Sequence, residues 1–209
     1  MNSMTIGTYQ MSAFGLYLPE YTIPAPTVQT KFVQIIGRDG SVDLSEALGI
    51  HYDSRNWSLD FKHLDPTVNW HTLTSAVMNA IHGKRLTFEF DDDPGYHWTG
   101  RISVSSYVSS RGTGTLKVSI VSDPFKLKNE ATVVQASGTV SLTNEGAMPV
   151  VPSVTATEET TLTWEISGCD YTYTMQAGTS VIPQLTLYPG STEVTVTSPV
   201  TFTYTEGSL

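Results

Sequence analysis

The stretch Asp123–Lys128, DPFKLK, divides the sequence into two parts of different composition. All eleven Lys and Arg residues lie at or before Lys128, so residues 1–128 carry 11 positive and 12 negative groups, whereas residues 129–209 carry none and 8. Thr becomes frequent at the same place. Because charge and composition change together, the sequence predicts two domains, at residues 1–130 and 131–209.

The overall composition is typical of a globular protein and excludes several classes. Of the 209 residues, 39% are hydrophobic and 15% are charged, which argues against wholesale disorder. The acidic second part lacks the Lys and Arg that nucleic-acid binding requires. No apolar run approaches a membrane span, and the first residues lack a signal peptide. We therefore expect a protein made in the cytoplasm without a signal peptide. Cys169 is the only cysteine, and we expect it to be half-buried in a strand.

The second part reads as a series of antiparallel strands. Alternating residues place Leu162, Trp164 and Ile166 on one face of a strand, and the same pattern recurs in TEVTVT and VTFTYT. Turn residues in SGC, QAGTS, YPGST and TSPV are expected to separate the strands. This spacing is typical of an antiparallel β-sandwich.

The first part combines strands with one helix. From Trp70 to His82, Leu73, Val77 and Ile81 recur at four-residue intervals, with Ala76 and Ala80 beside them, so the pattern predicts a helix over about 70–82 that ends before Gly83. Alternating runs at residues 85–90, 96–110 and 113–122 predict strands. A further strand, through residues 32–36, is followed by a turn at GRDG, and IPAPT before it reads as an ordered edge or arm.

No pattern indicates catalysis, a metal or a cofactor. The five histidines lack zinc-ligand spacing, and the acidic run at residues 91–93 lacks the spaced ligands of a calcium loop. GTGT at residues 112–115 lacks the Lys of a phosphate-binding loop and is expected to be a hairpin turn. We therefore predict that the chain is not an enzyme and binds no cofactor.

The aromatic residues leave a second interpretation open. Four Trp and ten Tyr residues are enough to build a sugar-stacking surface on a β-sandwich. The local alternation also fits core or interface positions for the Trp residues. The alternative function is therefore a carbohydrate-binding β-sandwich module that recognises host cell-wall sugars, for which Trp98 and Trp164 are the stacking candidates.

Several motifs, in order along most of the chain, resemble the distal tail protein (Dit) family of siphophages. They are GRDGSVDLSEALG, YDSRNWSLDF, GKRLTFEFDDDPGYHWTGRIS, GTGTLKVSIVSDPFKLK and TNEGAMPVVPSVT. The length matches the short form of the family, without an inserted carbohydrate-binding module. The resemblance assigns structural roles to eleven motif residues, namely Gly37, Asp39, Gly40, Asp43, Arg55, Asp123, Pro124, Phe125, Gly146, Pro149 and Pro152.

Physical roles are expected for several of these residues. Gly37 and Gly40 permit a turn, and Asp43 is expected to accept backbone or Arg hydrogen bonds. In DPFKLK, Asp123 and Pro124 end a strand and Phe125 anchors the crossing in the core. Lys126 and Lys128 are expected to face water or a neighbouring molecule.

The resemblance implies a mainly β fold, with an N-terminal β-barrel-like domain bearing one helix and a C-terminal galectin-like antiparallel β-sandwich. It also implies a hexameric ring at the virion tail tip that joins the tail tube protein to a tail-associated lysin, tail fibre or receptor-binding protein. DNA would only pass through the channel, and no membrane is involved. The source is a phage or a prophage, and a tail-tube protein that stacks into long tubes is a third possibility.

Overall fold

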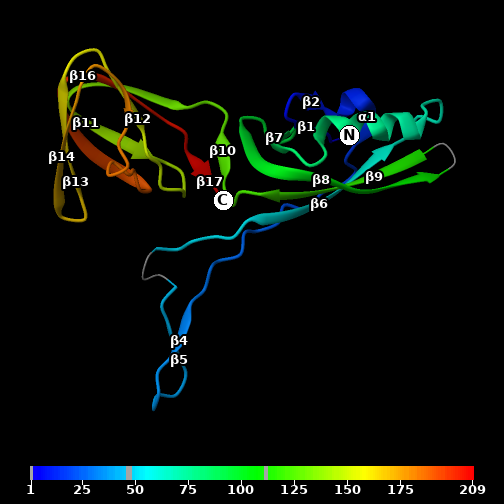
Figure 1. The fold of residues 1–209 in the computed structure, drawn as a ribbon, viewed down its shortest axis with the longest axis horizontal. Coiled ribbons are helices and arrows are strands. Elements are labelled where there is room, and N and C mark those ends of the chain that lie inside the picture. The colour runs from blue at the N-terminus through cyan, green and yellow to red at the C-terminus, as the bar shows by residue number, and fades with distance from the viewer. Residues whose placement is uncertain (1, 46–48, 111–112) are drawn as a thin grey trace. The chain divides into compact units, whose positions relative to one another are not determined.

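The computed structural model describes residues 2–45, 49–110 and 113–209. The chain forms two compact units, Met1–Pro124 and Phe125–Leu209, which divide within the DPFKLK stretch. Figure 1 shows both units built mainly of strands. The prediction of a mainly β fold with one helix is confirmed.

The main sheet of the first unit is antiparallel, with the strand order β2-β1-β7-β8-β9-β6-β3. A short 3-10 helix, η1 (Met11–Phe14), lies between β2 and β3 in the sequence. The strands are β1 (Met4–Ile6), β2 (Tyr9–Gln10), β3 (Leu16–Tyr17), β6 (Arg55–His63), β7 (Arg85–Phe90), β8 (Tyr96–Ser110) and β9 (Thr113–Ser122). The long central strands β8 and β9 form the hairpin expected around SRGTG, whose residues 111–112 lie outside the described residues.

The helix α1 (Trp70–Ile81) covers one face of this sheet. Asn69 caps it, because its side-chain oxygen accepts hydrogen bonds from the backbone N–H groups of His71 and Thr72 at 3.1 and 3.2 Å. Gly83 follows with a left-handed φ of 76°, as expected. The predicted apolar stripe is wrong at Ala76, which is exposed. The 3.6-residue repeat instead buries one face, which consists of Trp70, Thr74, Val77, Ala80 and Ile81.

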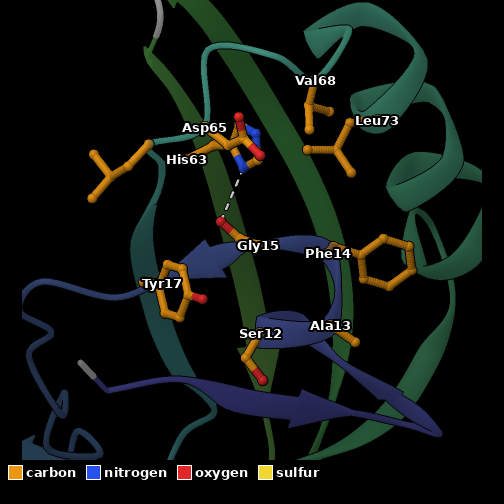
Figure 2. Close-up of a pocket in the computed structure, with 10 residues that line it drawn as sticks. Ser12, Ala13, Phe14, Gly15, Tyr17, His63, Asp65, Val68 and Leu73 are labelled. Carbon is orange, nitrogen blue, oxygen red and sulfur yellow. Dashed lines mark hydrogen bonds between the residues drawn. The ribbon is translucent and has the colours of Figure 1, made fainter.

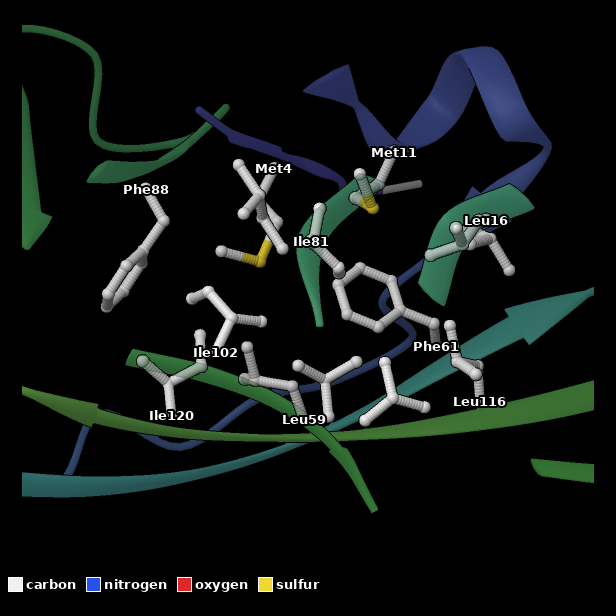
Figure 3. Close-up of a cluster of buried hydrophobic side chains, with 14 of the residues drawn as sticks. Met4, Met11, Leu16, Leu59, Phe61, Ile81, Phe88, Ile102, Leu116 and Ile120 are labelled. Carbon is white, nitrogen blue, oxygen red and sulfur yellow. The ribbon is translucent and has the colours of Figure 1, made fainter. Parts of the chain in front are cut away.

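The core of the first unit lies between the sheet and the segments that cover it, which include α1 and η1 (Figure 3). Alternate residues of β6 point into it, including Trp57, Leu59 and Phe61. Aromatic rings pack edge to face at one end, where the centroid of Trp57 lies 5.4 Å from that of Phe88 and 5.3 Å from that of Trp98. Such pairs add to the stabilisation that burial alone provides.

The second unit contains an antiparallel sheet in the order β14-β13-β16-β12-β15, and β11 also pairs with β16. A further short pair joins β10 to β17. The strands are β10 (Lys126–Lys128), β11 (Thr132–Asn144), β12 (Ser153–Ala156), β13 (Thr160–Ile166), β14 (Cys169–Met175), β15 (Gly178–Val181), β16 (Gly190–Tyr204) and β17 (Gly207–Ser208). The predicted inward faces are confirmed, because Leu162, Trp164, Val194, Val196 and Phe202 are buried.

Strand β16 corrects one predicted turn. TSPV lies inside this strand rather than between two strands. The register with β11 shifts at this point, because Ala136 pairs with Val200 but Gly138 pairs with Val196. Pro199 thus sits at an irregularity in the ladder, where a missing N–H is tolerated. On the N-terminal side of Pro199 β16 pairs with β13, and on its C-terminal side β16 pairs with β12. The irregularity therefore allows one strand to pair with two different strands in succession.

The abundance of Thr in the second unit is explained by its cross-strand pairs. Hydroxyl groups of Thr139 and Thr195 lie 2.9 Å apart, and those of Thr155 and Thr179 are also 2.9 Å apart. These residues are exposed and directly opposite each other on adjacent strands. Thr suits such positions because it combines strand propensity with a hydroxyl that bonds across the ladder. Cys169, expected to be half-buried, begins β14 and is exposed.

The close approach of α1 to the sheet depends on Gly114 in β9. A Cβ atom at this position would lie 2.5 Å from Cε2 of Trp70, which is closer than packed atoms can approach. The Trp70 ring also stacks on His63, with centroids 5.6 Å apart. The absence of a side chain at residue 114 therefore allows Trp70 to lie on the strand.

We predict that Gly114→Ala destabilises the first unit by about 1–3 kcal/mol, the usual cost of overpacking. Urea unfolding followed by tryptophan fluorescence measures this, since Trp57, Trp70 and Trp98 all lie in the first unit. Thr113→Ala, at the exposed neighbouring residue, is the matched control and should leave the midpoint nearly unchanged. Equal midpoints for the two variants would show that Trp70 moves aside without cost.

Candidate functional site

The described residues offer several candidate surfaces for contact with other molecules. Within residues 2–45, 49–110 and 113–209, no group of three or more His, Cys, Asp and Glu side chains is placed to hold a metal ion. In the same residues no helix is long and apolar enough to cross a bilayer. Three features remain as candidates: an exposed hairpin arm, a pocket beside α1, and an ion-pair cluster at the start of the second unit.

The arm, defined here as residues 24–45 and 49–54, contains a two-stranded hairpin built on β4 (Phe32–Gln34) and β5 (Ser41–Asp43) (Figure 1). Three residue pairs form its ladder, of which Val33 opposite Val42 is the middle one. Backbone bonds extend the pairing toward its base, where the N–H of Gln29 donates to His51 O at 2.9 Å. Residues 46–48 of the GRDGSVDLSEALG motif lie outside the described residues.

The motif residues of the arm shape its turn and one strand. Gly37 and Gly40 have φ values of 82° and 76°, which glycine adopts without strain, and Asp39 lies between them. The Asp43 carboxylate accepts hydrogen bonds from the Ser45 hydroxyl and, at 2.9 Å, from the Ser45 N–H. These hydrogen bonds lower the pKa of Asp43. Asp43 thus accepts a backbone bond, one of the two expected kinds, and fixes the return strand.

Apolar side chains of the arm are exposed to an unusual degree. Every residue from Lys31 to Gly40 is exposed, and Ile36 is fully accessible. The exposed large apolar residues of the arm are Val28, Phe32, Val33, Ile35, Ile36, Leu44 and Ile50. An isolated two-stranded hairpin is marginally stable in water. Because contiguous exposed apolar surface marks an interaction site, the arm is a candidate docking element.

Arg55 holds the base of the arm to the end of the first unit. Its Nε donates to the carbonyl oxygen of Pro124 at 2.6 Å, and its Nη1 donates to that of Pro24 at 2.9 Å. The residue is buried, and burial lowers the pKa of its guanidinium. A planar guanidinium reaches two carbonyls at once, which one ammonium cannot do with the same geometry. The structure thus brings together two of the predicted motif residues, Arg55 and Pro124.

We predict that Arg55→Lys destabilises the first unit by roughly 1–3 kcal/mol, because at least one half-buried carbonyl loses its donor. Protease cleavage within the arm should also become faster, since the arm is no longer held at Pro24. Urea unfolding and timed thermolysin digestion measure the two effects. Arg101→Lys is the matched control, because Arg101 is exposed and its guanidinium donates to the carbonyl oxygen of Gly83. Identical behaviour of both variants would contradict the role of Arg55.

A pocket of about 660 Å³ lies beside α1 in the first unit (Figure 2). Its polar side is His63, which is 4% exposed and whose Nδ1 lies 2.9 Å from the carbonyl oxygen of Gly15. Because a carbonyl only accepts, Nδ1 carries the proton and donates. Phe14 and Leu73 line the pocket, and the exposed residues Leu64 and Val68 form its rim. We refer to it as the His63 pocket.

Asp65 places a carboxylate on the rim of the His63 pocket. It accepts hydrogen bonds from the N–H and hydroxyl of Thr67 at 2.8 and 2.6 Å. These bonds lower its pKa, so the carboxylate is ionised at neutral pH. The pocket therefore combines apolar side chains and the buried His63 ring with a negative rim.

The basic end of DPFKLK belongs to an ion-pair cluster of the second unit. Lys128 pairs with Glu206, which is 3% exposed, and lies 3.5 Å from the carboxylate of Glu145. Glu206 also accepts the Glu145 N–H at 3.0 Å. Burial alone would raise the pKa of Glu206, but the hydrogen bonds from Lys128 and Glu145 N–H outweigh it and lower the pKa. Lys128 is thus partly exposed to water, as expected, but its ammonium group is also the counter-charge that the buried Glu206 requires.

The same cluster explains one motif glycine. A Cβ atom on Gly146 would lie 2.5 Å from the carbonyl oxygen of Gly207, so only glycine fits there. Asn144, which sequence reasoning missed, closes the turn: its Oδ1 accepts the Gly146 N–H at 3.0 Å, and its Nδ2 donates to Met148 O at 2.8 Å. The repeated strand pattern gave no signal for Asn144 or Glu206, because both look like ordinary surface residues in the sequence.

We predict that Lys128→Met destabilises the second unit by roughly 3 kcal/mol at neutral pH, since it leaves a buried carboxylate unpaired. A lowered pKa stabilises the fold above the unfolded value, 4.5 for Glu, and this contribution is lost as pH falls through the folded value. The difference between the variant and the natural chain should therefore shrink in acid.

Urea unfolding followed by circular dichroism, at neutral pH and below pH 4.5, checks both parts of the prediction about Lys128. Lys126→Met is the matched control, because it removes the same charge from the same strand, two residues away. Equal losses for both variants would show that net charge, and not the pair with Glu206, sets the effect.

The remaining motif residues lie in separate places. Asp123 accepts a hydrogen bond from Nη2 of Arg85 at 2.5 Å, in a pair that is half exposed. Phe125 is half-buried, Pro149 is exposed, and Pro152 is buried just before β12. The structure thus distributes the eleven motif residues over the arm, the arm's base and the entry to the second unit, and it does not gather them into one site.

The tryptophans proposed for sugar stacking are all buried. Trp57, Trp70, Trp98 and Trp164 are each less than a tenth exposed. Trp164 Nε1 donates to Gln184 O at 3.3 Å, and its ring stacks on Tyr171 with centroids 5.6 Å apart. Trp98 and Trp164 therefore form no open platform for a sugar ring, and their alternation is explained by the cores.

Comparison with known proteins gives results for structures only. No protein-family model matches the chain, and no curated protein sequence matches it. The crystal structure of SPP1 Dit, described as a paradigm of the hub adsorption apparatus in phages that infect Gram-positive bacteria, superposes with a TM-score of 0.76 at 14% identity, covering 100% of both chains. This chain shares its fold with that Dit hub protein.

Two structures of the phage p2 baseplate in its activated conformation, one with Sr and one with Ca, also contain a similar chain. Each has a TM-score of 0.51 at 7% identity, covering 99% of this chain and 98% of that one. The resemblance inferred from the motifs is thus confirmed at the level of the fold, over both units.

Proposed function

We propose that this chain is a structural distal tail protein, the baseplate hub of a long-tailed phage or prophage. It would form a hexameric ring that joins the tail tube to the tail-tip adhesion apparatus and lets DNA pass. The observation that carries the proposal is the end-to-end similarity in fold to SPP1 Dit, which includes both units and leaves no part of either chain unmatched.

The surfaces of the chain support assembly. Exposure of the apolar side chains of the arm to water is unfavourable. In a ring, neighbouring subunits would cover these side chains. The second unit, residues 125–209, carries Lys126 and Lys128 against eight acidic residues. Such a surface does not suit contact with DNA phosphates. The first unit is therefore assigned to the ring and its channel, and the second to the periphery.

The remaining parts of the proposal concern partners and location. The ring would contact the tail tube protein on one side and a tail-associated lysin, tail fibre or receptor-binding protein on the other. It would act at the virion tail tip after synthesis in the host cytoplasm. Its role would be mechanical, with no reaction catalysed by the chain, and no cofactor or membrane is required.

The proposal predicts closed rings in solution. Light scattering over a concentration series should show a species of about 137 kDa, six times the 22.8 kDa chain, because head-to-tail contacts that close give a defined copy number. Negative-stain images of that species should show a central hole. A monomer at every concentration would contradict self-assembly, and long stacked tubes would favour a tail-tube protein.

A further inference from the structure

Building on the proposed ring, we propose that the tip of the arm of one copy docks in the His63 pocket of the next copy. The occupant of the pocket is thus a second copy of this chain. The tip consists of Ile35, Ile36 and Arg38, and the receiving surface consists of Leu64, Val68 and Asp65 around the pocket. This assigns both sides of one ring contact to named residues.

The arm tip has the properties of an inserting element. Ile36 is fully accessible and Ile35 is half accessible, immediately before the turn at Gly37. A β-strand advances about 3.3 Å per residue, so the 13 steps from Pro24 to Gly37 span at most about 43 Å. Arg55 fixes the base at Pro24. The tip can therefore lie up to this distance from the base of the arm.

The His63 pocket has the complementary properties. Its volume of about 660 Å³ is ample for two aliphatic side chains, and Phe14 and Leu73 line it. Leu64 and Val68 expose 52% and 40% of their surface on its rim. They belong to the loop between β6 and α1, which Thr67 and Asp65 brace by hydrogen bonds. The receiving surface is thus apolar and ordered.

Charge also matches across the proposed contact. Arg38 follows Ile36 by two residues and has no ion-pair partner among the described residues. Asp65 follows Leu64 directly, and within the described residues its carboxylate forms no ion pair with a Lys or Arg; its neighbours are Thr67 and the His63 ring. Seating the tip brings these two charges to the same rim. The neighbouring Asp39 is then left toward solvent, where a carboxylate needs no partner.

The two surfaces are different patches of one chain, which decides the kind of assembly. A contact between unlike patches is heterologous, and it produces a ring when the rotation closes. Two copies related by a two-fold axis would instead need one self-complementary patch. The arm and the pocket therefore fit a ring of identical subunits better than a symmetric dimer.

Site-directed cross-linking tests the contact in the full chain. The exposed thiol of Cys169 is first removed by Cys169→Ser. One sample then carries Ile36→Cys and another Leu64→Cys, and the two are mixed and treated with a short bismaleimide. We expect cross-linked dimers in the mixture, and a ladder up to six chains when both substitutions are in the same chain. Ile36→Cys mixed with Val121→Cys is the control, since Val121 is 50% exposed on β9.

Each outcome decides between the inference and the function on which it rests. Rings that form without cross-linking between residues 36 and 64 would overturn the arm contact and leave the hub intact. Cross-linking only within one chain would show that the arm covers its own pocket, which also overturns it. The absence of any ring would remove the proposed function itself.

A charge exchange provides a second, independent readout. Arg38→Asp and Asp65→Lys should each raise the concentration at which half of the chains assemble by about tenfold or more, and the double variant should restore it. Circular dichroism confirms that each variant is folded. Assembly that is unchanged in both single variants, or a double variant that is worse than either, would contradict the pairing of Arg38 with Asp65.

Discussion

The buried guanidinium of Arg55 is the contact on which the arrangement of the first unit depends. It binds the carbonyl at the point where the chain leaves the sheet for the arm, and the carbonyl at the point where the unit ends. Both carbonyls belong to prolines, Pro24 and Pro124. Proline stiffens the backbone at each of these points. Arg55 therefore holds both the base of the exposed arm and the segment that follows β9.

The second unit is closed by a comparable contact between its first and last strands. Lys128 on β10 pairs with Glu206, the residue that precedes β17, and the two strands also share backbone bonds. The basic residues of DPFKLK are thus part of the closure of a domain otherwise without Lys and Arg. One cation, Lys128, is enough to neutralise the buried carboxylate of Glu206, because the other acidic residues of the unit are exposed to water and need no partner.

The elements that were predicted correctly from the sequence are those in which burial of one face in a core determines the spacing of the apolar residues. Alternation found β6, β7, β13 and the buried face of β16, because a strand with one buried face repeats every two residues. It failed at TSPV, where pairing with two neighbours keeps one strand continuous through Pro199. It also missed the pairing of Lys128 with Glu206 and the exposure of Ala76, since a distant partner and the exact helical phase are not encoded in local spacing.

In the arm, the apolar sequence pattern and the observed burial disagree most clearly. Phe32, Val33, Ile35 and Ile36 were predicted as a strand, yet β4 ends at Gln34 and none of these side chains is buried. Selection for a stable monomer would replace such residues with polar ones, because they add no core and invite association. Residues that violate the rule for an isolated chain are expected where it contacts another molecule, as in the proposed ring. In the proposed contact, the motif glycines at positions 37 and 40 would present Ile36 and Arg38 at the end of a tight turn.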